Sequence, residues 1–158
     1  MTKGKALFLG SMLALLVPMV MAADAAADSS LGTWKLNVAK STFGSGTVPK
    51  SETRTYSATS MGTQVVIESE DSTGKKTKTE TLLTYDGQPQ KVVGNADFDA
   101  VSTKRVDKYE TTADMLKGGK VIGSLRRLVS KDGKTLTINQ KTLKADGSTE
   151  TSLGFYER

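Results

Sequence analysis

Hydrophobic and polar positions alternate with a period of two along most of this chain, beginning shortly after residue 30. Segments rich in Thr, Val, Ile and Tyr are separated by turn-forming pairs such as Asp132-Gly133 and Asp146-Gly147. After the N-terminal apolar run there is no long amphipathic stretch with the helical period of 3.6. The pattern predicts a first strand at Trp34, followed by strands over residues 52–59, 63–69, 78–86, 100–106, 108–116, 120–130, 134–143 and 148–157.

Short hairpins that join strands in chain order form an antiparallel meander. An open meander leaves an unpaired edge that invites aggregation, and closure into a barrel removes that edge. The 158 residues suffice for one domain with a substantial core. We therefore expect an all-β fold, a single antiparallel up-and-down β-barrel of roughly 8–10 strands.

The N-terminus has a different pattern, that of an export signal. Lys3 and Lys5 precede an uncharged apolar run that extends to Ala22 and is interrupted by Pro18. This run is short for an uncleaved anchor that must span about 30 Å of hydrocarbon, and small residues follow it. The predicted organisation is a signal peptide over 1–22, a flexible linker over 23–30 and a barrel domain over 31–158. The protein is then exported, periplasmic or secreted, with no membrane span after cleavage.

The amino-acid composition excludes several kinds of catalytic and metal site. The chain has no histidine and no cysteine, so its side chains cannot build a zinc site, an imidazole haem ligand, a thiol nucleophile or a serine–histidine relay. The stretch NADFD (95–99) lacks the ligand spacing of a calcium loop and is interpreted as a polar turn. We expect no enzyme activity, no catalytic residue, no metal and no cofactor.

The charge argues against a nucleic-acid partner. Cleavage after Ala22 removes two lysines and leaves 136 residues with 20 basic and 17 acidic side chains, a net charge of +3. These charges are mixed along the chain, whereas nucleic-acid binding needs clustered Lys and Arg. A monomer is expected, and no nucleic acid.

Two ends of the domain carry a family resemblance. Gly32-Thr33-Trp34 is similar to the Gly-x-Trp that opens the first strand of lipocalins. The longer GTWKL and the terminal FYER resemble fatty-acid-binding proteins, and both families belong to the calycin superfamily. Over residues 31–158 the segments GTWKLNVAKSTF, YDG, GNADFDAVSTKRVD and RRLVSKDGKTLTI resemble small exported bacterial lipocalin-like proteins without assigned chemistry. The resemblance implies a barrel whose interior holds a small apolar molecule, with Trp34 as a plug across its closed end.

Two departures from fatty-acid-binding proteins bear on the ligand. The segment between Phe43 and Ser51 is too short and too rich in Gly and Pro for the two helices that cover the barrel in that family. Those proteins also carry an arginine two residues before the tyrosine of the last strand, and here that position is Gly154. A preference for free fatty acids is therefore not expected.

The adjacent pair Arg126-Arg127 tests the strand register, because one of the two must face inward in a regular strand. Two-residue turns at Asp132-Gly133 and Asp146-Gly147 place Arg127 inward, opposite Ile138, and Ile138 opposite Phe155. A three-residue turn instead brings Arg126, Leu128 and Tyr156 inside. More apolar side chains face the interior in the first register, so we favour that register. An inward arginine is then either paired structurally, with Trp34, Glu68 or Glu80, or a hook for a ligand.

The expected function follows from the barrel. The segment 79–85 mixes Thr, Leu and Tyr, a lining that suits a cavity with some polar points. We expect an exported lipocalin-like protein that binds a small apolar or amphiphilic molecule. The alternative is a ligand-free β-barrel that acts as an envelope or secreted protein-interaction module. The predicted ligand-binding residues are Trp34, Tyr85, Leu125, Arg127, Ile138 and Phe155.

Overall fold

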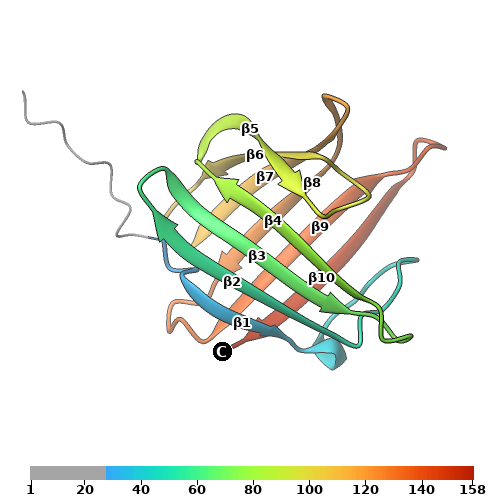
Figure 1. The fold of residues 1–158 in the computed structure, drawn as a ribbon, viewed down its shortest axis with the longest axis horizontal. Helices are drawn as coiled ribbons and strands as arrows, with labels where there is room; N and C mark the ends of the chain where they lie inside the picture. Colours follow the sequence, from blue (N-terminus) through green and yellow to red (C-terminus); the bar gives the residue numbers. More distant parts are fainter. Residues whose placement is uncertain (1–27) are drawn as a thin grey trace, which may run out of the picture.

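The computed structural model describes residues 28–158, so the predicted signal peptide lies outside the described residues. Ten antiparallel strands form one closed barrel in the order β1-β10-β9-β8-β7-β6-β5-β4-β3-β2. Figure 1 shows β2, β3 and β4 crossing the front of the barrel, with β8, β9 and β10 behind. The predicted fold class is therefore confirmed. The strands are β1 (Gly32–Leu36), β2 (Ser51–Thr59), β3 (Gly62–Glu70), β4 (Lys76–Leu83), β5 (Asp86–Val93), β6 (Ala100–Arg105), β7 (Glu110–Lys117), β8 (Lys120–Val129), β9 (Thr135–Leu143) and β10 (Thr149–Glu157).

The meander gives the barrel two unlike ends. The β2–β3, β4–β5, β6–β7 and β8–β9 connections lie at one end, together with residues 28–31 and the C-terminus. We call this end the floor. The β3–β4, β5–β6, β7–β8 and β9–β10 connections and the segment 37–50 lie at the other end, the mouth. The only helix among the described residues is the 3-10 turn η2 (Val38–Lys40) at the mouth. The sequence predicted no helical lid between Phe43 and Ser51, and the described structure has none there.

Trp34 closes the floor. Its side chain is 0% exposed, and its indole N–H donates a hydrogen bond to the carbonyl of Ser30 (2.6 Å). The guanidinium of Arg158 stacks on the outer side of the indole, 4.2 Å from the ring centroid, and donates to the carbonyl of Leu31 (2.9 Å). The predicted burial of this tryptophan at the closed end is confirmed. Residues 28–30, predicted to be part of a flexible linker, are instead packed into the floor, so the folded domain begins before residue 31.

The strand β5 was not predicted. Gly87 and Pro89 weaken its β pattern, and both lie where the pairing with β6 is shifted by a bulge, which is where a strand tolerates proline. The expected Asp86-Gly87 turn is also wrong, because both residues belong to β5. The chain turns earlier, at Thr84 and Tyr85, and Tyr85 has a φ of 62°.

The two C-terminal hairpins differ in how well their register was predicted. In β8–β9 the predicted register is confirmed, with Cα partners Leu125–Gln140, Arg127–Ile138 and Val129–Leu136. In β9–β10 the prediction is wrong, because Ile138 pairs with Gly154 instead of Phe155. The turn leaves three residues between Lys144 and Ser148, with Gly147 at φ 83°, and this shift turns Tyr156 inward and Phe155 outward.

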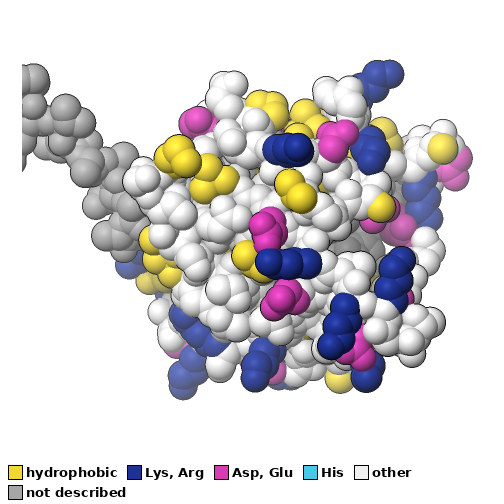
Figure 2. Space-filling view, viewed as in Figure 1, with side chains coloured by type: hydrophobic (Ala, Val, Ile, Leu, Met, Phe, Trp, Pro, Cys, Tyr) yellow, Lys and Arg dark blue, Asp and Glu magenta, His cyan; other side chains and the backbone are white. Residues whose placement is uncertain are grey.

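The outer surface carries mixed charge. Figure 2 shows Lys and Arg side chains interspersed with Asp and Glu over the face drawn, with hydrophobic side chains in small separate groups. Within residues 28–158, no helix has the length and hydropathy needed to cross a membrane.

Candidate functional site

The barrel encloses a cavity of about 260 Å³. Side chains from β2 through β9 line it, because alternate residues of each strand face inward. The lining combines aliphatic and aromatic groups with a set of threonines. Its apolar members are Tyr56, Val65, Ile67, Leu83, Val92, Phe98, Val101, Ala113, Leu125 and Ile138, and its threonines are Thr77, Thr79, Thr81, Thr103 and Thr111.

A buried ion pair lies at the floor of this cavity. Arg127 of β8 is 4% exposed, and its Nη2 lies 3.5 Å from Oδ1 of Asp28, which is 8% exposed. The same nitrogen donates to the hydroxyls of Tyr85 (3.1 Å) and Thr111 (2.9 Å). The guanidinium carbon lies 4.8 Å from the ring centroid of Tyr56, a cation–π contact. We call these five residues the floor cluster.

Asp28 is held by more partners than Arg127. Its Oδ1 accepts hydrogen bonds from the backbone N–H (3.0 Å) and hydroxyl (2.6 Å) of Ser30, and its Oδ2 from the hydroxyls of Thr63 (3.0 Å) and Tyr85. Burial alone raises the pKa of Asp28, but the charge of Arg127 and the hydrogen bonds from Ser30 and Tyr85 outweigh it and lower the pKa from 3.8 to about 2. The carboxylate is therefore charged at neutral pH.

One donor of Arg127 has no acceptor. Its Nη1 is the only buried side-chain nitrogen or oxygen in the described part of the chain without a hydrogen-bond partner. All the hydrogen bonds of this guanidinium are made through Nη2, and Arg127 lines the cavity. A buried donor without a partner costs about 1–3 kcal/mol, more for a charged group, so this nitrogen lowers the stability of the floor.

Tyr85 is held in the floor cluster against its backbone preference. A φ of 62° is unusual for a bulky residue and costs of the order of 1–3 kcal/mol. The backbone N–H of Tyr85 donates to the hydroxyl of Thr103 (3.2 Å), and its phenol bonds Asp28. Burial, more than the neighbouring charges, raises the pKa of Tyr85, so the phenol stays protonated as a donor.

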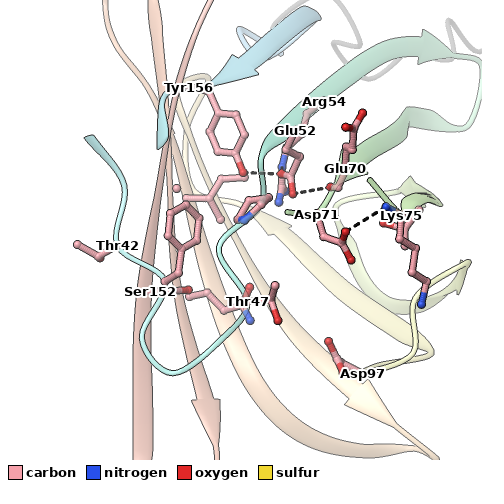
Figure 3. A pocket seen from close by; sticks show the side chains of 17 residues that line it. Thr42, Thr47, Glu52, Arg54, Glu70, Asp71, Lys75, Asp97, Ser152 and Tyr156 are labelled. Atoms are coloured by element: carbon pink, nitrogen blue, oxygen red, sulfur yellow. Dashed lines mark hydrogen bonds and ion pairs between the residues drawn. The ribbon is translucent and has the colours of Figure 1, made fainter. Parts of the chain in front are cut away.

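A second ion pair lies at the mouth. Arg54 Nε is 2.7 Å from Glu52 Oε1, and the same carboxylate accepts from the hydroxyls of Tyr156 (2.6 Å) and Ser69 (2.9 Å). The guanidinium of Arg54 stacks on the Tyr156 ring at 5.0 Å. Burial raises the pKa of Glu52, but the Arg54 charge and these hydrogen bonds lower it below its ordinary value. We call these four residues the mouth cluster, and Figure 3 shows the Glu52 carboxylate between Arg54 and Tyr156.

The mouth cluster borders an open vestibule of about 440 Å³. The vestibule and the inner cavity share lining residues, so the cavity opens to solvent through the vestibule. The shared residues are Glu52, Arg54, Ser69, Thr77, Asp97, Ile138 and Gln140. Figure 3 shows Asp97 on the opposite side of this space from Tyr156.

The β5–β6 loop covers part of the cavity. Asn95 Oδ1 accepts the backbone N–H groups of Asp97 (2.8 Å) and Phe98 (3.2 Å), which makes the segment 95–99 the polar turn that was predicted. The ring of Phe98 packs against the barrel core and lines the cavity. No group of three or more Asp or Glu side chains that could hold a metal ion occurs in residues 28–158.

The predicted site residues divide into three groups. Leu125, Arg127 and Ile138 line the cavity. Tyr85 lies beneath it in the floor cluster, and Trp34 lies in the core at the closed end without lining it. Phe155 points away from the interior and carries Lys40 Nζ at 5.0 Å from its ring centroid, so its predicted place in the lining is wrong.

The expected partners of Arg127 are also corrected. Its carboxylate is Asp28, and its aromatic partner is Tyr56. Trp34 is stacked by Arg158 instead. Glu80 pairs with Lys78 and Glu68 is exposed, so neither reaches the interior.

Several interior residues were not predicted, although three of them share a signal in the sequence. Glu52, Arg54 and Tyr56 alternate along one strand and therefore share a face. Asp28 is the only acidic residue among the six that precede Trp34, but nothing in the sequence pattern turns it inward. Comparison of the chain with protein-family models and with curated proteins found no match.

Proposed function

We propose that this chain is an exported lipocalin-like protein that binds a small apolar or amphiphilic molecule inside its barrel. The observation that carries the proposal is the cavity itself: an apolar and threonine-lined interior that reaches solvent and has the buried Arg127 in its wall. A barrel that acted through its outer surface alone has no need for either feature, because packed side chains would fill its interior more stably.

The dimensions favour a small ligand. The cavity of about 260 Å³ lies just below the usual range for ligand sites, roughly 300–1,000 Å³, and the vestibule of about 440 Å³ extends it. At about 30 Å³ for each water-sized group, the inner part has room for roughly nine non-hydrogen atoms. A ligand in such an open site keeps part of its surface in water, so we expect affinities around micromolar, or about 8 kcal/mol.

Export remains part of the proposal. It is supported by the basic, apolar and small-residue succession over residues 1–22. The intact mass of the protein recovered from the envelope or culture fluid of its native host tests it. The expected mass is that of a chain that begins close to residue 23. A full-length species in the membrane would contradict the proposal.

Ligand binding is tested on the same material. A mass spectrum under non-denaturing conditions is expected to show the protein with a small molecule that is released on unfolding. In parallel, the emptied protein is titrated calorimetrically with 2-octanone, which has nine non-hydrogen atoms. A saturable one-site isotherm is expected. No retained molecule, together with no heat up to the solubility limit, would leave the surface-interaction module as the better account.

A further inference from the structure

The inner cavity has two ends at which the polar group of a ligand could be held. One end is the floor. The other is the passage to the vestibule, bordered by the residues that line both spaces, and we call it the neck. The two ends differ in the polar atoms that a ligand can reach, and this difference bears on the direction in which an amphiphile lies.

At the floor, the polar atoms are engaged or out of reach. The phenol of Tyr85 donates to Asp28, and the hydroxyl of Thr111 accepts from Nη2 of Arg127. Nη1 of Arg127 is unpaired but has almost no accessible surface, so an atom in the cavity does not contact it. A polar group that a ligand carried to the floor would lose its hydration without finding a partner.

At the neck, two donors are free. The Arg54 guanidinium bonds Glu52 through Nε alone (2.7 Å), and its Nη1 and Nη2 have no hydrogen-bond partner within residues 28–158. Neither nitrogen is among the buried unpaired atoms of that part of the chain, so both keep surface that a ligand can reach. The bond to Glu52 and the stacking on Tyr156 hold the guanidinium in place, so a ligand there orders no further side chain. Figure 3 shows Arg54 beside Glu52 at the edge of this space.

The charges around Arg54 are nearly balanced. Glu52 pairs with it from the same strand, and Asp97 of the β5–β6 loop borders the neck from the other side. Arg127, deeper in the cavity, is paired with Asp28. The other charged residues of the vestibule are Glu70, which pairs with Lys50, and Asp71 and Lys75. One guanidinium therefore meets two carboxylates in the neck, so Arg54 offers its two N–H donors to an oxygen acceptor whether or not that acceptor is charged.

From this contrast we infer that an amphiphile with one terminal carbonyl or carboxylate group lies tail first in the barrel, with its oxygen on Nη1 and Nη2 of Arg54 and its unbranched tail toward the floor. The inference rests on the proposed function and specifies the residue that binds the head group and the direction of the ligand. The inner cavity of about 260 Å³ holds roughly nine non-hydrogen atoms, so a chain of about that length fills it from the neck to the floor.

The role of Arg54 is tested by calorimetric titration of the wild type, Arg54→Met and Arg126→Met with octanamide and octanoate. These two ligands have the same tail and head groups of equal size, and they differ in charge. Arg54→Met removes both free donors and is expected to weaken the binding of each ligand roughly tenfold or more, because a hydrogen bond to a charged donor is lost. Arg126→Met is the matched control and should leave both affinities unchanged, since Arg126 is paired with Glu110 on the outer wall.

The direction of the ligand is tested in the wild type by intermolecular nuclear Overhauser effects. Leu83 marks the floor, because its Cα partner Thr63 donates a hydrogen bond to Asp28, and Ile138 marks the neck, because it lines both spaces. The terminal methyl group of octanamide is expected to contact the methyl groups of Leu83, and the methylene next to its carbonyl those of Ile138. This measurement needs no variant, so it tests the inference even if Arg54→Met is too unstable to titrate.

The outcomes separate the inference from the proposed function. Equal affinity of octanamide for the wild type and Arg54→Met, or the reverse pattern of methyl contacts, would overturn the inference and leave ligand binding intact. A loss seen with octanoate alone would also overturn it, because Arg54 would then attract a charge instead of binding a carbonyl oxygen. Failure of both ligands to bind the wild type would overturn the proposed function and this inference with it.

Discussion

The floor cluster and the mouth cluster are built from the same residue types, an arginine, a carboxylate and a tyrosine, yet they differ in completeness. At the mouth, Glu52 accepts three hydrogen bonds and sits 2.7 Å from Arg54. At the floor, the shortest approach of Arg127 to Asp28 is 3.5 Å, and Nη1 has no partner. The Glu52 carboxylate at the mouth is fully engaged, whereas the floor pair is longer and leaves the buried Nη1 of Arg127 without an acceptor.

The difference shows how one barrel can use buried charge in two ways. At the mouth, the Glu52 carboxylate of β2 accepts hydrogen bonds from Tyr156 of β10 and Ser69 of β3, and so links three strands around the entrance. A pair with an unpaired donor deep in the interior, as at the floor, carries the cost of that donor, about 1–3 kcal/mol. Substitutions in the two clusters should therefore differ in how much they change the free energy of unfolding.

Removing the floor arginine should cost the most stability. Arg127→Met leaves Asp28 charged and buried, and breaking a buried pair costs about 3–5 kcal/mol of the free energy of unfolding. Arg54→Met should cost less, about 1–2 kcal/mol, because the Arg54 side chain is 18% exposed and Glu52 keeps two hydroxyl donors. Urea unfolding of the two variants measures both values. Equal losses would mean that the two clusters are energetically alike.

Trp34 supports the floor without contributing charge. Trp34→Ala removes a fully buried indole and should cost on the order of 3 kcal/mol. Fluorescence of the wild type should be blue-shifted in the native state, since this is the only tryptophan of the chain. Emission like that of tryptophan in water before denaturation would show that the floor is open.

The floor cluster should also make the free energy of unfolding depend on pH in the acid range. The pKa of Asp28 is lower in the folded protein, about 2, than its ordinary value of 3.8. The stabilisation from its charged form, about 2 kcal/mol, is therefore fully present above pH 4 and is lost as the pH falls from about 4 to 2.

Chemical denaturation of the wild type and Asp28→Asn across that pH range checks this dependence. The difference in unfolding free energy between the two proteins should shrink as the pH falls through that window. The Glu52 pKa is also lowered, so both proteins should share the remaining slope. A difference that stays constant with pH would contradict a charged Asp28 in the native state.

The smallest effect is expected at the arginine next in sequence to the floor. Arg126 lies on the outer wall and makes two hydrogen bonds to Glu110 (2.6 and 2.8 Å), with its side chain 53% exposed. Arg126→Ala should change the free energy of unfolding by no more than about 0.5 kcal/mol. A loss larger than that of Arg127→Met would mean that Arg126, and not Arg127, faces the interior from strand β8.

The sequence predicted the barrel and the direction of β8, because alternation and turn residues are local signals. The two-residue turn predicted at Asp132-Gly133 gave the observed register, in which Arg127 pairs with Ile138 and points inward. The same reasoning failed at Asp146-Gly147, where a three-residue turn with a left-handed glycine is compatible with the same letters and inverts the last strand.

The chemistry of the floor was less predictable, since it depends on long-range contacts. Asp28 reaches Arg127 across 99 positions, and no local pattern distinguishes it from a solvated residue in a linker. Tyr85 was placed in a strand because its type favours strands, but its phenol contacts hold it in a turn with positive φ. The alternation of polar and apolar residues shows which side chains of a strand point inward. Which inward side chains contact one another is decided only when the barrel closes.

The central claim is that Arg127 faces a ligand inside the barrel, and its side-chain NMR signal tests that claim most directly. The Nε–Hε resonances of Arg126 and Arg127 are followed while 2-octanone is added to the isotopically labelled protein. Arg127 is expected to shift in a saturable way with a dissociation constant around micromolar, while its neighbour Arg126 on the outer wall stays in place. An Arg127 resonance that does not move up to the solubility limit of the ketone would contradict the claim.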